Sequence, residues 1–381
     1  MKTNLLRVLL KYTYKLITLL IAVLSQIMLR IPQAWRKPLL LICIVLFAVA
    51  WIDYVRVLNR PLITGEEPQT YVVESGSNLT RIVYDLEKKG FIERPRYLLL
   101  HARLHGSANQ INTGEYLIKP KETAKQFLQQ LFDGKVVQYA LTIVEGWNFS
   151  QLMSELSQNT NLLQTLQGLS DKAIMNKLGY PEQHPEGRFY PDTYLFPRGT
   201  TDVQFLQRAY RAMEQYLQQA WQERDVGLPF KTMDEALVMA SVVEKETGLA
   251  SERRAIAGVF IRRLEKRIRL QSDPTVIYGM GKRYKGNIRK RDLLEETPYN
   301  TYRRFGLPPT PIAMPGKEAI YATLHPQDGD ALYFVSRGDG SHYFSATLEE
   351  HNQAVIKYQL KGRKKSFSSF DAKTGKTKPQ Q

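Results

Sequence analysis

The longest apolar run of this 381-residue chain lies near its N-terminus. Residues 39–52 carry no polar side chain except the Cys43 thiol. As a helix this run spans about 21 Å, less than the roughly 30 Å of a bilayer core. The run extends to 38–57 when Trp51 and Tyr54 are taken as aromatic side chains of a membrane interface. We therefore predict a transmembrane helix over residues 38–57, in preference to a buried core helix or a cleaved signal peptide.

A second apolar stretch, residues 16–29, leaves the topology open. If both stretches cross the membrane, the rest of the chain returns to the cytoplasm; if only 38–57 crosses, it is exported. Residues 1–37 carry seven basic side chains and no acidic one, which favours their retention in the cytoplasm. We expect 1–37 to be a basic cytoplasmic segment whose apolar stretch lies along the inner leaflet. The body of a single-pass protein then lies on the outer, periplasmic side of the plasma (inner) membrane.

The pattern after the apolar run predicts a small α+β module. Two prolines in residues 58–68 predict a linker, and Tyr71–Glu74 predicts a short strand. Apolar residues then recur at helical spacing in two consecutive segments, and Gly114–Tyr116 opens a return strand. The β-α-α-β order over residues 69–120, with the words V-x-S-G-x-x-L and G-E-Y, resembles the LysM peptidoglycan-binding module. Any small α+β cap explains the pattern equally well.

Two histidines in this module, His101 and His105, lie four residues apart on the second predicted helix. This spacing supplies half of a metal site, but no further histidine or cysteine stands nearby in the sequence. We therefore predict no metal site here.

Residues 139–359 predict a larger mixed α+β domain. A strand at 139–145 ends in Glu145-Gly146, helices follow through 149–178, and a hairpin joins 331–335 to 342–345 before a last helix. The loop 186–194 is rich in aromatic and polar residues. Such a loop is typical of sugar sites, because apolar sugar faces stack on rings, and a packed aromatic turn explains it equally well.

One helix of this domain stands out because it is apolar on every side. Thr232 and Glu235 form the capping pattern of a helix start, and Gly248 is placed to end the helix. Every residue between Ala236 and Val243 except Ser241 is apolar, so we predict a buried helix.

Glu244 lies near the end of that helix, in line with small and apolar residues one and two turns earlier. Desolvation on such a face raises the pKa of a carboxyl group and lets it act as an acid near neutral pH. Glu246 lies about 200° further round the helix, so the two carboxylates do not form a catalytic pair. Most glutamates at helix ends are solvated or in ion pairs, and this remains the alternative for Glu244.

The following helix, predicted at 252–266, has a basic edge, which we interpret as a solvated face. Its members are Arg253, Arg254, Arg262, Arg263 and Lys266.

The net charge of +16 does not indicate nucleic-acid binding, because it sits at the two ends. Residues 1–37 contribute +7 and residues 360–381 contribute +6, which leaves +3 for the body between them. A nucleic-acid-binding domain concentrates its charge on the folded body. We interpret 360–381, rich in Lys, Ser, Thr and Gly, as a basic disordered tail. The single cysteine excludes an internal disulfide and a cysteine-rich zinc site.

Several long words of the chain carry a specific resemblance. They are VVEKET (242–247), RLQSDPTVIYGMG (269–281), YNTY (299–302), GLPPTPIAMPG (306–316), LYFV (332–335) and a closing pattern of His342, Phe344, His351 and Asn352. In this order they resemble the endolytic murein transglycosylase family, also called MltG or YceG-like, over about residues 69–358. The family layout is the one predicted above, with a membrane helix, a LysM-like module and a catalytic transglycosylase domain, here 139–359. The 37 residues before the membrane helix depart from it, since the family's anchor usually begins near the first residue.

The resemblance implies a lyase that cuts nascent peptidoglycan glycan strands internally, between N-acetylmuramic acid and N-acetylglucosamine, and leaves 1,6-anhydromuramic acid ends. It places the catalytic glutamate on Glu244 and implies no cofactor. The polar residues Gln271, Asp273, Asn300 and Tyr302 stand in matching words and are candidates for binding the sugar. The implied partners are glycan strands, the lipid bilayer and a peptidoglycan synthase.

Two other functions stay open on the sequence. One is a muramidase hydrolase, in which Asp192 or Asp273 serves with Glu244 as a second carboxylate. The other is a non-enzymatic glycan-binding scaffold for cell-wall assembly.

Overall fold

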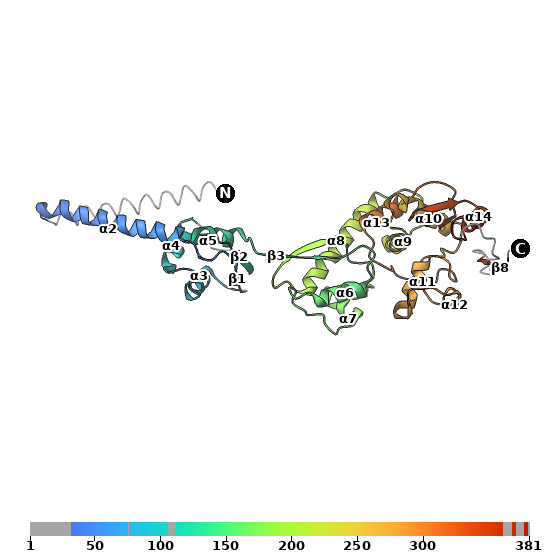
Figure 1. Ribbon diagram of the computed structural model, residues 1–381, viewed down its shortest axis with the longest axis horizontal. Helices are drawn as coiled ribbons and strands as arrows, with labels where there is room; N and C mark the ends of the chain where they lie inside the picture. The colour runs from blue at the N-terminus through green and yellow to red at the C-terminus, as the bar shows by residue number, and fades with distance from the viewer. Residues whose placement is uncertain (1–31, 75, 106–110, 361–367, 371–376, 380–381) are drawn as a thin grey trace. The chain divides into compact units, whose positions relative to one another are not determined.

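The computed structural model describes residues 32–74, 76–105, 111–360, 368–370 and 377–379 (Figure 1). These fall into two compact units, residues 1–137 and 138–381, each described here by itself. The predicted inner-leaflet stretch, 16–29, lies outside the described residues.

The first unit begins with the long helix α2, Gln33–Asn59. Its 27 residues correspond to about 40 Å, and its apolar side chains are exposed along most of its length. Within the described residues, α2 is the helix long and apolar enough to cross a membrane. It includes the whole range predicted from the sequence and extends beyond it at both ends.

The rest of this unit has the β-α-α-β order predicted for residues 69–120, followed by a further helix. The elements are β1 (Gln69–Val73), α3 (Leu79–Lys88), α4 (Pro95–His105), β2 (Gly114–Ile118) and α5 (Ala124–Asp133). The two strands pair antiparallel, with Tyr71 opposite Tyr116. Helix α5, which the sequence analysis did not identify, starts at a capping box of Thr123 and Gln126 and adds Phe127 to the core.

The end of α2 is bonded to the small module. The Tyr54 hydroxyl lies 2.9 Å from Nδ1 of His101, and Asp53 forms an ion pair with Arg94. The segment predicted as a linker, 58–68, enters the core of the unit with Leu58, Leu62 and Ile63. Helix α2 therefore continues into the folded module through packed and hydrogen-bonded residues.

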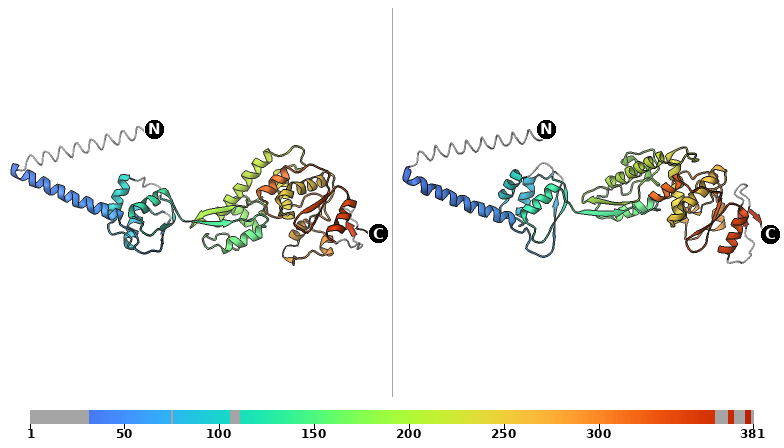
Figure 2. Two further views of the ribbon diagram at one scale, coloured as in Figure 1. Left: turned by 45° about the horizontal axis from the view of Figure 1, so that its top comes forward. Right: turned by 90° about the horizontal axis from the view of Figure 1, so that it is seen from above.

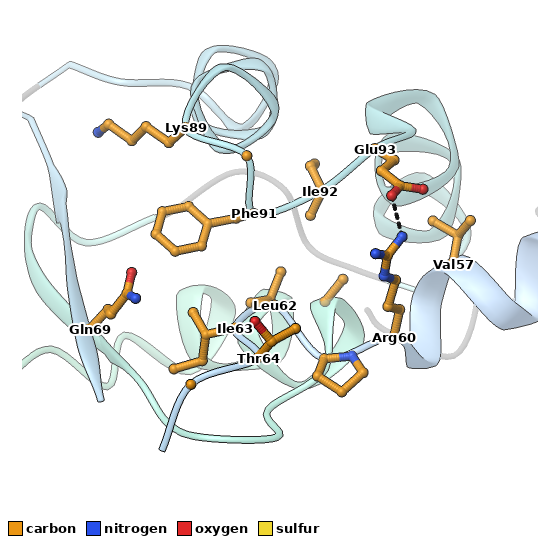
Figure 3. A pocket seen from close by; sticks show the side chains of 14 residues that line it. Val57, Arg60, Leu62, Ile63, Thr64, Gln69, Lys89, Phe91, Ile92 and Glu93 are labelled. Atoms are coloured by element: carbon orange, nitrogen blue, oxygen red, sulfur yellow. Dashed lines mark hydrogen bonds and ion pairs between the residues drawn. The ribbon is translucent and has the colours of Figure 1, made fainter. Parts of the chain in front are cut away.

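A small pocket of about 280 Å³ opens where the chain leaves α2 (Figure 3). Phe91 and Ile92 face Leu62 and Ile63 across it, and the ion pair of Arg60 with Glu93 borders it. In this pocket the partly buried ring of Phe91 lies among polar side chains, which include Gln69 and Lys89.

In the second unit, two antiparallel strands and three helices contribute to one hydrophobic cluster. They are β3 (Gln138–Thr142), α6 (Phe149–Gln158), α7 (Asp171–Leu178), β4 (Thr193–Pro197) and α8 (Asp202–Gln222). Figure 2 shows β3 and β4 side by side, and Leu141 pairs with Tyr194 in their register. Phe189 and Tyr194 of the aromatic loop are buried in this core, so packing accounts for those two rings.

Helix α9, Met233–Glu246, is the central helix of the unit. It packs against α8, α10 (Arg253–Glu265) and α13 (Lys317–Leu324). All side chains from Ala236 to Val243 are buried, which confirms the prediction of a helix apolar all round. Thr232 accepts the backbone N–H of Glu235 at 3.2 Å, so the predicted cap is also confirmed.

Shorter elements complete the second unit. They are η1 (Ala250–Glu252), α11 (Asp273–Met280), η2 (Gly281–Arg283), α12 (Lys290–Leu294), β5 (Tyr333–Ser336), β6 (His342–Ser345), α14 (Leu348–Tyr358), β7 (Ser368–Phe370) and β8 (Thr377–Pro379). Strands β5 and β6 pair antiparallel, which confirms the predicted hairpin. In the tail for which we expect disorder, the described residues form the antiparallel pair β7–β8.

The basic edge of α10 is not the solvated face that we expected. Arg263 is 7% exposed; its Nε donates to the Leu332 carbonyl at 2.6 Å and its Nη1 to the Leu270 carbonyl at 2.8 Å. Arg262 donates to the Ala331 carbonyl at 2.8 Å. These guanidinium groups satisfy backbone carbonyls of loops that pack on the helix, a contact that charge patterning does not reveal.

Candidate active site

Glu244 lies on the last turn of α9 and its carboxylate is held from two sides. Oε2 accepts the backbone N–H of Gly316 at 3.0 Å, and Oε1 lies 3.8 Å from Nη2 of Arg253. The Glu244 side chain is only 7% exposed. This glutamate is therefore positioned by a fixed backbone donor and is largely removed from water.

Burial raises the pKa of the Glu244 carboxyl above its ordinary value. The Gly316 N–H and the Arg253 charge lower it, whereas the nearby Glu145 charge raises it further. Because desolvation is the largest of these causes, the Glu244 carboxyl group keeps its proton to a higher pH than an exposed glutamate does, which favours a role as a general acid.

The proline-rich segment 306–316 reaches Glu244 because it is bonded to α9 one turn earlier. The Oγ of Ser241 accepts the Ile312 N–H at 2.9 Å, inside the core. Met314 is then paired with the turn after β3: its N–H donates to the Trp147 carbonyl at 2.7 Å, and its carbonyl accepts from Gly146 at 2.8 Å. The rigid segment predicted from the prolines thus forms one wall at Glu244.

A cleft of about 1120 Å³ opens in this unit beside the glutamate. Its lining includes Gly146 and Lys245, the chain neighbours of Glu145 and Glu244, and Lys245 donates to the Gly146 carbonyl at 3.1 Å. The lining also includes aromatic and amide side chains, namely Phe149, Tyr278, Tyr284, Tyr299, Asn148, Gln151 and Gln167. Such a lining suits sugar rings, which stack on aromatic faces and hydrogen-bond through their edges.

Glu186 is a buried carboxyl group in the cleft lining, which does not include Glu244 itself. Its Oε2 accepts from the Tyr278 hydroxyl at 2.9 Å and its Oε1 from the Phe149 N–H at 3.0 Å. Burial raises its pKa to about 7. This residue joins the loop 186–194 to α11 and α6, a link that the sequence analysis did not identify.

The four residues predicted to bind sugar lie together where α11 begins beside the turn 299–302. The Tyr302 hydroxyl donates to Oδ1 of exposed Asp273 at 2.6 Å. Gln271 adopts a positive φ of 54° and donates its N–H to the Thr301 carbonyl at 3.2 Å.

Asn300, the fourth of these residues, is only 1% exposed. Its amide nitrogen donates to the carbonyls of Leu293 and Glu295 at 3.1 and 2.7 Å, where α12 ends. Its side chain therefore holds the protein backbone in this structure.

Glu246 faces this second cluster and not the side of Glu244. Its Oε1 accepts from the Ser272 hydroxyl at 2.5 Å, and burial raises its pKa to about 7. Different partners on different segments confirm that Glu244 and Glu246 lie on opposite faces of α9.

Asp192 and Asp273, the two candidates for a second carboxylate, each have a hydrogen-bond partner of their own. Oδ1 of Asp192 accepts the Thr193 N–H at 2.7 Å, and Asp273 is engaged by Tyr302. The charge that raises the pKa of Glu244 belongs to Glu145, at the turn after β3. In the sequence, Glu145 stands out only as a carboxylate before a glycine at the end of a predicted strand. The sequence analysis assigned no role to it.

Comparison with known proteins decides the family. The YceG-like family model matches residues 71–357 of the chain. The chain belongs to the YceG-like family. This confirms the resemblance found in the sequence words and covers both the small module and the domain that carries Glu244.

Two relatives of this YceG-like chain, from different bacteria, share the name endolytic murein transglycosylase. The chain is 31% identical over 304 residues to a protein of Bacillus subtilis named endolytic murein transglycosylase, covering 75% of this chain and 83% of that protein. It is 26% identical to a Streptococcus pneumoniae protein of the same name, covering 82% of this chain but 63% of the streptococcal one. A solved structure described as a yceG-like protein of Listeria monocytogenes is 28% identical with a TM-score of 0.48, covering 76% of this chain and 100% of that one.

Proposed function

We propose that this chain is a membrane-anchored endolytic lytic transglycosylase of peptidoglycan. It cleaves nascent glycan strands between N-acetylmuramic acid and N-acetylglucosamine and helps to terminate their elongation. The observation that carries the proposal is the Glu244 carboxyl group, buried, raised in pKa and fixed by the Gly316 N–H beside a large aromatic cleft. The shared name of the relatives supports the same reaction.

One carboxyl group suffices for the proton transfers of this chemistry. Protonated Glu244 gives its proton to the glycosidic oxygen as the bond from C1 of the muramic acid breaks. The Glu244 carboxylate then takes the proton of the C6 hydroxyl while O6 of the same sugar bonds to C1. The product is a 1,6-anhydromuramic acid end, and Glu244 is returned to its protonated form without activating a water.

We assign the second cluster to binding the strand. Exposed Asp273, oriented by the Tyr302 hydroxyl, and Gln271 offer acceptors and donors for sugar hydroxyl and acetamido groups. Asn300 supports these contacts by fixing the backbone beneath them.

We further propose that α2 spans the inner membrane once and that the body faces the periplasm. The length of α2 and its exposed apolar surface support a membrane span. The β-α-α-β module then contacts glycan in the manner of a LysM module, with the pocket of Figure 3 as its contact surface. Such an anchor places the enzyme beside the synthases that polymerise the strands.

The test is mass spectrometry of purified peptidoglycan strands incubated with the full-length protein in liposomes, as wild type and as Glu244→Gln. Wild type is expected to give internal fragments with anhydromuramic acid ends, and Glu244→Gln none. Glu265→Gln, which removes an exposed carboxylate from α10, is the matched control and keeps the activity. Reducing ends instead of anhydro ends would establish a hydrolase, and intact strands with wild type would favour a glycan-binding scaffold.

A further inference from the structure

Two carboxylates meet at Gly316. The Gly316 N–H donates to Oε2 of Glu244 at 3.0 Å, and a Cβ added to Gly316 would lie 1.9 Å from Oε1 of Glu145. Both groups therefore lie against one residue, although they come from the end of α9 and from the turn after β3. With covalent distances of about 1.5 Å along Gly316, the two carboxylates lie within about 8 Å of each other.

The surroundings of Glu145 leave its carboxylate available. Glu145 is exposed, and among the described residues its carboxylate has no hydrogen-bond or ion-pair partner. Its backbone is nevertheless fixed, because Gly146 and Trp147 pair with Met314. A carboxylate on a fixed backbone, without a hydrogen-bond partner among the described residues and close to Glu244, can stabilise a cationic centre in the substrate.

We propose that Glu145 is the second carboxylate of the active site and stabilises the positive charge that develops on C1 of the muramic acid. This rests on the proposed function. As the bond from C1 to the leaving oxygen breaks, the sugar becomes oxocarbenium-like, and a fixed negative charge nearby stabilises that state more than the bound substrate. Glu145 forms no bond and moves no proton; O6 bonds to C1, and both protons pass through Glu244.

The same position gives Glu145 an effect on the pH dependence. The charged groups that face Glu244 are Arg253 from α10, its neighbour Lys245 and Glu145. Arg253 and Lys245 lower the pKa of Glu244, and Glu145 raises it. Removal of the Glu145 charge therefore lowers the pKa of Glu244, so that the acid form is lost at a lower pH.

The experiment compares wild type, Glu145→Gln and Glu145→Asp as full-length proteins in liposomes on purified strands, by kcat, KM and the pH profile of kcat. Glu145→Gln keeps the shape over Gly316 without the charge. We expect kcat to fall by about 100-fold with KM nearly unchanged, because the charge on C1 exists only in the transition state. The alkaline limb of the profile moves to lower pH, while anhydro ends remain the product. Glu145→Asp keeps the charge and recovers part of kcat.

Glu318→Gln is the control for a general change of charge, because it removes an exposed carboxylate two residues after Gly316. We expect its kcat and the alkaline limb of its pH profile to equal those of wild type. The proposal is overturned if Glu145→Gln cleaves within twofold of wild type. It is also overturned if kcat falls while the alkaline limb stays in place and Glu145→Asp recovers nothing, since that pattern is structural damage. The proposed function fails separately, when wild type itself makes no anhydro ends.

Discussion

The backbone N–H of Gly316 and the carboxylate of Glu244 are 3.0 Å apart, although 72 positions separate them in the chain. The contact joins the end of α9 to the start of α13, two helices that pack against each other. The donor that fixes the Glu244 carboxylate is therefore held by the core of the domain and not by a free loop.

Gly316→Ala is expected to damage this site without unfolding the protein. Gly316 has a φ of −77°, which alanine adopts freely, but its Cβ would collide with Oε1 of Glu145. The end of the exposed Glu145 side chain gives way in this collision, and on the role proposed for Glu145 a displacement of its carboxylate by about 1 Å lowers kcat by about 100-fold. Strand cleavage and thermal unfolding, measured together, check this. Gly248→Ala, where a Cβ meets nothing within 4 Å, keeps wild-type activity, and equal activity of the two variants would contradict the argument.

Ser241→Ala is expected to destabilise the second unit. Ser241 is fully buried, and its Oγ accepts the Ile312 N–H at 2.9 Å. Without it, a buried N–H loses its partner, which lowers the free energy of unfolding by about 1–3 kcal/mol. Urea unfolding checks this, with Ser251→Ala on the exposed η1 as the control. A midpoint equal to that of wild type would show that the proline-rich segment is held without this bond.

Ionisation of Glu246 is expected to lower stability as the pH rises. Its folded pKa is about 7 and its ordinary value 4.5, so the folded protein binds more protons than the unfolded chain between these values. The stabilisation is complete below about pH 4.5 and is lost as the pH rises through 7. Thermal unfolding from pH 4.5 to 8 should show a smaller decline for Glu246→Gln than for wild type. The pKa of Glu186 is also raised to about 7, so its ionisation lowers stability over the same pH range. Glu246→Gln keeps Glu186 and therefore keeps this part of the decline.

Asp273→Ala is expected to weaken substrate binding while leaving the chemical step. The carboxylate lies on the cluster opposite Glu244, so KM rises by about tenfold and kcat changes little, as for loss of a uniform binding contact. Cleavage kinetics on purified strands measure both constants. Asp330→Asn, an exposed carboxylate, is the control. A fall in kcat at constant KM would place Asp273 in the chemistry instead.

The sequence was sufficient for the parts of the fold that depend on neighbours along the chain. The start of α9 follows from the short-range contact of Thr232 with Glu235, and its burial follows from an unbroken apolar run. The β5–β6 hairpin follows from two short runs around a turn. These signals are local, so they can be read in order from the residues.

The sequence was insufficient where distant segments meet. The Glu145 carboxylate reaches Gly316 across 171 positions, and Arg263 finds its acceptor on Leu332. Asn300 showed the polarity of a ligand-binding residue, but the end of α12 occupies its amide. In each case tertiary packing decides which group the side chain contacts, and no local sequence pattern encodes that contact.

The union of α2 with the small module has a consequence for where the protein can act. At about 40 Å, α2 is longer than the roughly 30 Å hydrocarbon core, so a span of the bilayer leaves its last turns, with Asp53 and Tyr54, at the surface. Those turns are bonded to α4, so the module has no tether with which to move away. With α2 in the bilayer, as proposed above, the module samples a thin layer next to the lipid headgroups. On that proposal, the height of a glycan strand above the membrane selects newly made strands over older wall.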